Sequence, residues 1–272
     1  MRMKSSTHFG VLILAASIGS SSAIDRFVSL TGGHVPPFTS WTDAATNIQD
    51  AIEAASAGDV VWVTNGVYAT GGKVMAGDLT NRVVIDKALT VQSVNGWAVT
   101  TIEGARDFVN VSATAVRGVW MTNGAVLRGF TVRDGQSRSV GDADTLRSGG
   151  GVWCSTTNAT IVDSVIRENA SAQAGGGCYR GRLENCLVLG NQSFNGGGVF
   201  GSTVVNSAIV SNSASSSGGG AYQSALTNCT VTFNSASMNG GGTASSLTYN
   251  SIIWSNSSAA PIIVIVPSAP PA

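Results

Sequence analysis

The chain has 272 residues, enough to bury the core of one large domain or of two small ones. Only 11% of the residues are charged, and 15 acidic residues balance 15 basic ones, which excludes the basic field that a nucleic-acid-binding protein needs. The 43% of hydrophobic residues argue against disorder, yet no apolar run reaches the roughly 18 residues of a membrane-spanning helix.

The first segment has the pattern of a secretory signal peptide. Arg2 and Lys4 give it a basic start, residues 9–18 form a short apolar stretch, and small residues stand directly before Ile24. We therefore predict that residues 1–23 are a signal peptide and that the protein is exported. Export would permit disulfide bonds.

Residues 41–57 are predicted to form an amphipathic helix, with Thr42 or Asp43 as its N-cap and Gly58 directly after its end. Its apolar stripe would consist of Ala45, Ile48, Ile52 and Ala55. Short strands separated by turns are predicted to follow. They cover residues 59–63, 82–85, 89–94, 100–103, 108–111 and 126–132.

A repeat of 21 or 22 residues dominates the rest of the chain. A Gly-Gly-Gly triplet recurs at residues 149–151, 175–177, 196–198, 218–220 and 240–242. Two polar columns keep the same spacing, namely Asn169, Asn191, Asn212, Asn234 and Asn256, and Asp163, Asn185, Asn206, Asn228 and Asn250. An earlier copy covers residues 127–135, and its offset indicates an insertion within residues 135–148. The regular repeats therefore run over residues 127–256.

Units of this length and composition, rich in Val, Ile, Thr, Asn, Ser and Gly, favour short strands. Stacked about 4.8 Å apart, they would form the coils of a parallel β-solenoid, in which equivalent residues make ladders. Asn ladders and glycine triplets suit the corners. A leucine-rich repeat would need LxxLxL, which no copy supplies. We predict one domain over residues 24–256, with roughly nine coils and the helix covering its first coil.

Ladder geometry predicts buried, free thiols. Cys186 and Cys229 hold equivalent positions two coils apart, roughly 9.6 Å, whereas a disulfide needs Cα atoms within about 7 Å. They would be small buried residues that alternate with Ser207. Cys154 and Cys178 lie on adjacent coils but out of register by two residues, so a bond between them is marginal and stays open.

Residues 48–68, IQDAIEAASAGDVVWVTNGVY, resemble the opening of right-handed parallel β-helix proteins of the pectate-lyase-like superfamily. In those proteins a helix with IQxAIxxA precedes GDxVxVxxGxY. The later units resemble the repeats of bacterial polymorphic outer-membrane and autotransporter passenger proteins. The resemblance implies an all-β, right-handed parallel β-helix with an N-terminal capping helix, located outside the cell or on the bacterial outer-membrane surface. These motifs encode corners and core, so they predict fold rather than function.

A polysaccharide lyase would need an Arg or Lys base and, in most cases, carboxylates that hold Ca²⁺. Residues 185–272 contain no Asp, Glu, Lys, Arg or His, so the candidates precede them. Arg133 and Arg167 would stack on adjacent coils and point outward, with Asp134 and Glu168 beside them. They could hold an acidic sugar, one Arg acting as base, or they could form a charge-compensated surface. The superfamily's hydrolase and lyase signatures are absent.

Two further sets of residues are candidates for binding. Asp142 and Asp144, in the insertion, are the Ca²⁺ candidates; no other metal and no cofactor is predicted. An aromatic column lies two residues after successive glycine triplets and contains Trp153, Tyr179, Phe200 and Tyr222. Pointing outward, it would stack on sugar rings; pointing inward, it would be an internal stack, and both readings stay open.

Three functional hypotheses follow. The first is an exported, non-catalytic β-helix that binds carbohydrate or mediates adhesion; the second is a lyase acting on acidic polysaccharide; the third is a structural rod. Residues 257–272 form a C-terminal tail whose apolar centre, flanked by prolines, suits an edge strand. An uncovered, uncharged β-edge there predicts self-association, whereas no integral membrane span is expected.

Overall fold

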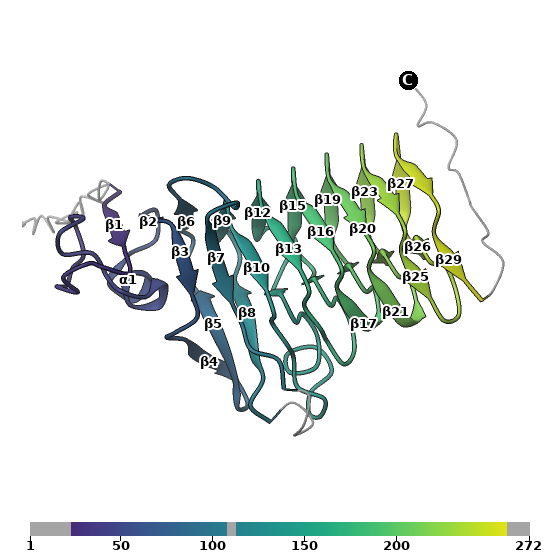
Figure 1. Cartoon of the computed structure of the whole chain (residues 1–272), viewed down its shortest axis with the longest axis horizontal. Coiled ribbons are helices and arrows are strands. Elements are labelled where there is room, and N and C mark those ends of the chain that lie inside the picture. The colour runs from purple at the N-terminus through teal and green to yellow at the C-terminus, as the bar shows by residue number, and fades with distance from the viewer. Residues whose placement is uncertain (1–22, 108–112, 260–272) are drawn as a thin grey trace, which may run out of the picture.

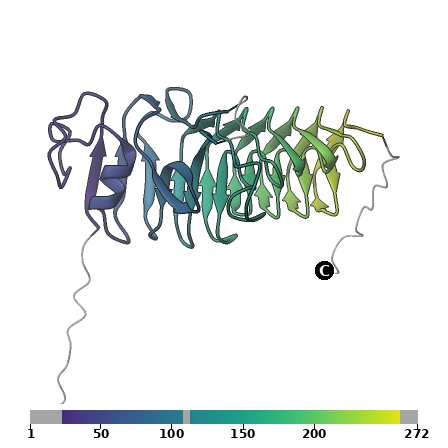
Figure 2. The ribbon, with the colours of Figure 1, turned by 90° about the horizontal axis from the view of Figure 1, so that it is seen from below.

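The computed structural model describes residues 23–107 and 113–259, which form a rod of stacked coils (Figure 1, Figure 2). Three sheets of nine, eight and eight strands run along the rod, and a fourth sheet has four strands. Apart from the β4–β5 hairpin, the strand pairs within these ranges are parallel. The predicted parallel β-helix is confirmed.

The four sheets are labelled A to D, and the strands of each sheet follow in the order in which they pair. Sheet A consists of β1 (Asp25–Val28), β2 (Val60–Val63), β6 (Thr90–Ser93), β9 (Val126–Arg128), β12 (Thr160–Val162), β15 (Arg182–Glu184), β19 (Thr203–Val205), β23 (Ala225–Thr227) and β27 (Leu247–Tyr249). Sheet B consists of β3 (Gly66–Tyr68), β7 (Thr100–Glu103), β10 (Thr131–Arg133), β13 (Val165–Arg167), β16 (Leu187–Leu189), β20 (Ala208–Val210), β24 (Thr230–Thr232) and β28 (Ile252–Trp254).

Sheets C and D complete the coils. Sheet C consists of β4 (Lys73–Ala76), β5 (Leu79–Ile85), β8 (Val116–Met121), β11 (Val152–Cys154), β14 (Cys178–Tyr179), β18 (Val199–Phe200), β22 (Ala221–Tyr222) and β26 (Thr243–Ala244). Sheet D consists of β17 (Gln192–Asn195), β21 (Ser213–Ser217), β25 (Ser235–Ala236) and β29 (Ser257–Ser258). The predicted strand over 126–132 is in fact two, β9 and β10, because Gly129 turns the chain at φ +76°. The predicted strand over 108–111 lies outside the described residues.

The core is a set of apolar ladders inside the coil. In sheet B the middle residue of each three-residue strand points inward and is fully buried from β10 to β24, where these residues are Val132, Ile166, Val188, Ile209 and Val231. Cys186, Ser207 and Cys229 are buried at the corner before sheet B, as predicted. All four cysteines are buried free thiols, including Cys154 and Cys178.

The helix covers the first coil, as predicted, but it is shorter. α1 spans Ile48–Ala54, and its N-cap is Asn47, whose Oδ1 accepts the backbone N–H of Asp50 at 3.0 Å. Neither Thr42 nor Asp43 is the cap. Ile48, Ala51 and Ile52 are buried in the main core, so α1 closes the N-terminal end of the apolar ladders, at the purple end of Figure 1.

The residues before α1 stay outside the helix because their backbone extends sheet A. Ala45 forms a parallel bridge with Val28, its N–H donates to the carbonyl of Phe27, and its carbonyl accepts from Ser29. A helical Ala45 would have to break both bonds. The chain also leaves the helix at Ala55, before the predicted end.

Two asparagine ladders follow the corners. Asn191 is fully buried, and its side-chain Nδ2 donates to Oδ1 of Asn212 in the next coil at 2.9 Å. The bond repeats from Asn169 to Asn256 along the inner ladder. The outer ladder occupies the corner between sheets A and B, where each residue from Asp163 to Asn250 has a positive φ, a conformation that Asn tolerates.

At the C-terminal end of the described residues, no helix follows the last coil. Its strands β26, β27, β28 and β29 form the ends of the four sheets, and Leu247, Ile252 and Trp254 are exposed. The predicted edge strand within the tail lies outside the described residues, apart from β29. Within the described part of the chain, no helix is long and apolar enough to span a membrane.

Candidate carbohydrate-binding groove

The structure places Arg133 beside Arg167 on the outer face of sheet B. The two residues are register partners in β10 and β13, on strands whose middle residues point into the core. Arg133 is ion-paired with Glu103 and lies 3.6 Å from the carboxylate of Asp134. Arg167 is ion-paired with Glu168. The four predicted residues therefore come together, and Glu103 joins them.

Both arginines of this cluster are ion-paired. Glu103 and Asp134 lie beside Arg133, and Glu168 lies beside Arg167, so three carboxylates surround two guanidinium groups. To abstract a proton, either arginine would first have to leave its carboxylate partner, so the ion pairs disfavour either residue as a base. The side chains of Arg133 and Arg167 are about a third exposed, so the pairs add little stability.

The insertion folds over the outer face of sheet C. Arg117, fully buried in β8, anchors it by donating to the carbonyls of Thr145 at 2.6 Å and of Ser148 at 2.9 Å. The same guanidinium donates to Gly149 O and to Asn81 Oδ1. Burial among these neutral acceptors lowers the pKa of Arg117 to about 9.

The two aspartates of the insertion already have protein partners. Asp142 accepts hydrogen bonds from the backbone and side chain of Thr145, and these bonds hold the pKa of its carboxyl below the usual value. Asp144 accepts from the hydroxyl of Tyr179 at 2.8 Å and lies 3.4 Å from the guanidinium of Arg180. Within residues 23–107 and 113–259, no three His, Cys, Asp or Glu side chains gather as a metal site would require.

The aromatic column points outward, on the face of sheet C opposite the core ladder. Its rings stack face to face on successive coils, with centroids 5.4 Å apart between Tyr179 and Phe200 and 5.5 Å apart between Phe200 and Tyr222. Trp120 extends the stack below Trp153. Because the rings stack on one another, their faces are largely occupied and unavailable to a sugar.

The insertion covers the first predicted rings of this column. Trp153 donates from its indole nitrogen to the carbonyl of Asp144 at 2.7 Å, and Trp153 and Tyr179 are buried. Burial and the hydrogen bond to Asp144 raise the pKa of Tyr179 to about 12. Phe200 and Tyr222, which lie beyond the insertion, are half-buried. Most of the column is therefore a structural stack that holds the insertion.

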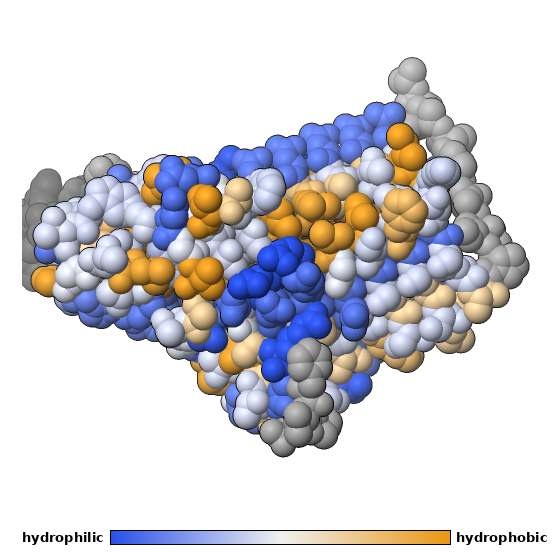
Figure 3. All heavy atoms as spheres, in the orientation of Figure 1, coloured by the Kyte–Doolittle hydropathy of each residue, from blue (hydrophilic) through white to orange (hydrophobic). Residues whose placement is uncertain are grey.

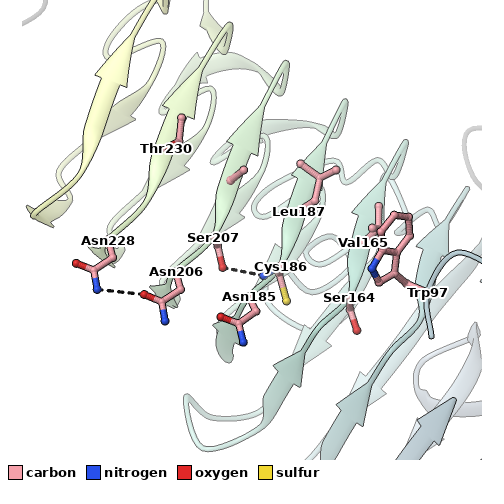
Figure 4. Close-up of a pocket in the computed structure, with 11 residues that line it drawn as sticks. Trp97, Ser164, Val165, Asn185, Cys186, Leu187, Asn206, Ser207, Asn228 and Thr230 are labelled. Carbon is pink, nitrogen blue, oxygen red and sulfur yellow. Dashed lines mark hydrogen bonds between the residues drawn. The ribbon is translucent and has the colours of Figure 1, made fainter. Parts of the chain in front are cut away.

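A groove runs along the rod on a different face, at the corner between sheets A and B (Figure 4). It has a volume of about 560 Å³. Val165, Leu187 and Ala208, each the first residue of its strand, form the floor, and Trp97 stands at one end beside Val165. Asn185, Asn206, Asn228, Ser164, Ser207, Thr230 and Cys186 complete the lining.

The groove lining is uncharged. Asn185, Asn206 and Asn228 expose their amides along one wall, and Trp97 is 49% exposed. The thiol of Cys186 is buried, and burial raises its pKa to about 12, so it stays protonated at neutral pH. In Figure 3 the charged cluster of sheet B, in dark blue, borders an apolar area, in orange, on the same face of the molecule.

Comparison with solved structures agrees with this architecture. A rhamnogalacturonan lyase is 14% identical with a TM-score of 0.52, and the match covers 85% of this chain and 63% of that one. A pectate lyase is 14% identical with a TM-score of 0.51, over 79% of this chain and 55% of that one. A pectin methylesterase variant in complex with a hexasaccharide is 13% identical with a TM-score of 0.50, over 85% and 79%.

These three proteins are parallel β-helices, and so is this chain. At such low identity the likeness shows the fold alone. This chain spans less than two thirds of the length of either lyase. No family model matches the sequence, and no curated protein matches it either.

Sequence reasoning missed Trp97 and the groove. Trp97 lies in the loop between β6 and β7, outside the repeat, so no periodicity marks it. The outer asparagine ladder was predicted from the repeat, but as residues that form the corners of the coils and not as the wall of a groove. A search for exposed aromatic residues in the loops before the regular repeats could have found Trp97.

Proposed function

We propose that the protein is an exported, non-catalytic β-helix that binds carbohydrate in the groove of sheet B. One observation carries the proposal: the groove combines an apolar floor, exposed amides and an exposed Trp97, and none of the 11 side chains that line it is charged. Sugars present hydroxyl groups and apolar ring faces, which amides and indoles bind well. The groove follows the rod axis, which suits an extended chain of sugar units.

The same lining supports binding rather than turnover. General acid–base catalysis needs a titratable group within hydrogen-bond reach of the reacting atoms. The groove offers a buried, protonated thiol, amides and hydroxyls, and the nearby arginines are held by carboxylates. Lyase activity on acidic polysaccharide is the alternative. It is favoured by the adjacent positions of Arg133 and Arg167, which are register partners on neighbouring strands.

Replacement of Trp97 by alanine is expected to weaken carbohydrate binding about 10-fold or more, because an exposed indole loses its stacking contact with a sugar ring. The measurement is titration calorimetry against a panel of plant and bacterial polysaccharides. Phe194→Ala is the control, because Phe194 is 45% exposed on sheet D and does not line the groove. Formation of unsaturated product by the wild type, lost in Arg133→Ala and Arg167→Ala, would favour the lyase instead.

The proposed location is the extracellular space or the bacterial cell surface. Two sequence features support it, the signal-peptide pattern of residues 1–23 and the resemblance of the repeats to surface passenger proteins. On such a surface, a rod that binds glycans would serve adhesion.

End-to-end self-association is a further role that one observation favours. The last described coil exposes Ile252 and Trp254 at 66% and 60%, and within residues 23–107 and 113–259 no further strand pairs with the sheets at that end. We expect the wild type to form oligomers as its concentration rises, and Ile252→Lys to reduce them, because charge on an edge strand opposes pairing. Sedimentation velocity over a concentration series tests this, and a monomer at every concentration would contradict it.

A further inference from the structure

The outer asparagine ladder is interrupted inside the groove. Asn185 Nδ2 donates to Asp163 Oδ1 at 3.2 Å, and Asn228 Nδ2 donates to Asn206 Oδ1 at 3.1 Å. Asn250 continues the series by donating to Asn228. The structure describes both Asn185 and Asn206, and their side chains form no hydrogen bond with each other. Figure 4 shows the two side chains adjacent. The break lies in the groove wall.

The break leaves one donor and one acceptor side by side. Asn206 uses its Oδ1 to accept from Asn228, so its Nδ2 is available. Asn185 uses its Nδ2 to donate to Asp163, so its Oδ1 is available. Both residues are exposed and line the groove, where a ligand can reach them. A group that accepts from Asn206 and donates to Asn185 would complete the ladder.

A sugar hydroxyl is such a group, because it both donates and accepts. An ionised carboxylate only accepts, so it would bond to Asn206 but face the oxygen of Asn185 with like partial charge. Among the described residues, the arginines near the groove already have carboxylate partners: Arg128 with Asp163, Arg167 with Glu168 and Arg182 with Glu184. The groove thus favours an uncharged ligand.

We propose that the groove binds a neutral saccharide, one hydroxyl of which bridges Asn185 and Asn206 while a sugar ring lies against Trp97. The inference rests on the proposed carbohydrate-binding function and adds the charge class of the ligand and its polar anchor. It places the anchor at the corner between sheets A and B, where the strands of sheet B begin, whereas Arg133 and Arg167 are the last residues of β10 and β13.

The test compares matched ligands and matched variants. The ligands are neutral hexasaccharides of glucose and of galactose, a hexamer of galacturonate, and the same hexamer fully methyl-esterified. The variants are Asn206→Gly and Asn250→Gly. Both positions have a positive φ, of +50° and +45°, which glycine adopts without strain, and Asn250 lies in the same ladder outside the groove. Thermal melting verifies that both variants fold.

Titration calorimetry should show at least one neutral hexasaccharide binding about 10-fold or more tightly than ionised galacturonate. Asn206→Gly should weaken that binding about 5- to 30-fold, and Asn250→Gly should leave it unchanged. Preference for ionised galacturonate over every neutral ligand would overturn the inference and leave carbohydrate binding intact. If Asn206→Gly and Asn250→Gly bind the neutral hexasaccharide with equal affinity, Asn206 is not the polar anchor. No binding by any ligand would overturn both the inference and the proposed function.

Discussion

Replacing Gly197 by alanine is expected to destabilise the protein by more than about 3 kcal/mol, the largest effect that we predict for a single methyl group. A Cβ at this position would stand 2.2 Å from the carbonyl oxygen of Ser213 and 2.5 Å from that of Gly219, both in the next coil. Neither backbone can withdraw without breaking the coil-to-coil hydrogen bonds of Gly197 and its neighbours.

The measurement is the free energy of unfolding in a denaturant titration. Gly96→Ala is the control, because Gly96 has φ +86° but no atom within 4 Å of its added Cβ. Gly96→Ala should lower the free energy of unfolding by only about 1–2 kcal/mol, because a left-handed backbone is unfavourable for alanine. A Gly197→Ala protein as stable as Gly96→Ala would refute the close-approach explanation.

This prediction also revises the role of the glycine triplets. We predicted them as corners that need a positive φ, and the structure gives such a φ to the first glycine of each triplet, as in Gly196 and Gly218. The second and third glycines are needed because successive coils approach too closely for a side chain, as at Gly197 and Gly198. Only stacking of the coils shows this second reason.

The second large effect is expected at the inner asparagine ladder. Asn212→Leu should lower the free energy of unfolding by about 3–5 kcal/mol, because several buried polar groups lose their partners at once. Asn212 Nδ2 donates to the carbonyl of Val188 at 3.0 Å and to Asn234 Oδ1 at 2.9 Å. Its Oδ1 accepts both the backbone N–H and Nδ2 of Asn191. Leucine conserves most of the volume, so cavity formation contributes little.

Asn228→Gly is the matched control for this ladder. Asn228 belongs to the outer ladder and is exposed, so water can replace the side-chain hydrogen bonds that the substitution removes. The Asn228→Gly substitution should lower the free energy of unfolding by less than about 1 kcal/mol, measured by the same denaturant titration. If both substitutions destabilise equally, burial of the inner ladder is not what makes it important.

Most of the fold could be predicted because the repeat aligns equivalent residues. The spacing of Asn169, Asn191 and Asn212 predicts both the coil length and the inner ladder, and the apolar column beside it predicts the core. The capping helix was predicted in place but too long. Its first residues carry a helical pattern, yet Ala45 forms backbone bonds to β1 that no local signal reveals.

The site was harder to predict because it depends on loops. Sequence reasoning identified Arg133, Arg167 and the aromatic column but left open what surrounds them. The structure pairs Arg133 with Glu103, one coil earlier and outside the clear repeat, and lays the insertion over Trp153 and Tyr179. Arg133 and Glu103 are register partners on adjacent coils, but they lie 30 residues apart because the earlier coils are longer than the repeat. The contacts of the insertion join residues 9 and 35 positions apart.

By itself, then, the sequence determined the architecture: a period of 21 or 22 residues with small, polar and β-branched positions in register is compatible with few folds other than a stacked β-coil. It also determined that residues 185–272 can supply no charged side chain. The tertiary structure alone decided which face is open. The insertion, anchored by Arg117, covers Trp153 and Tyr179 on sheet C, while the loop that carries Trp97 leaves the corner of sheet B accessible. Loop packing is aperiodic, and so it had to be seen in three dimensions.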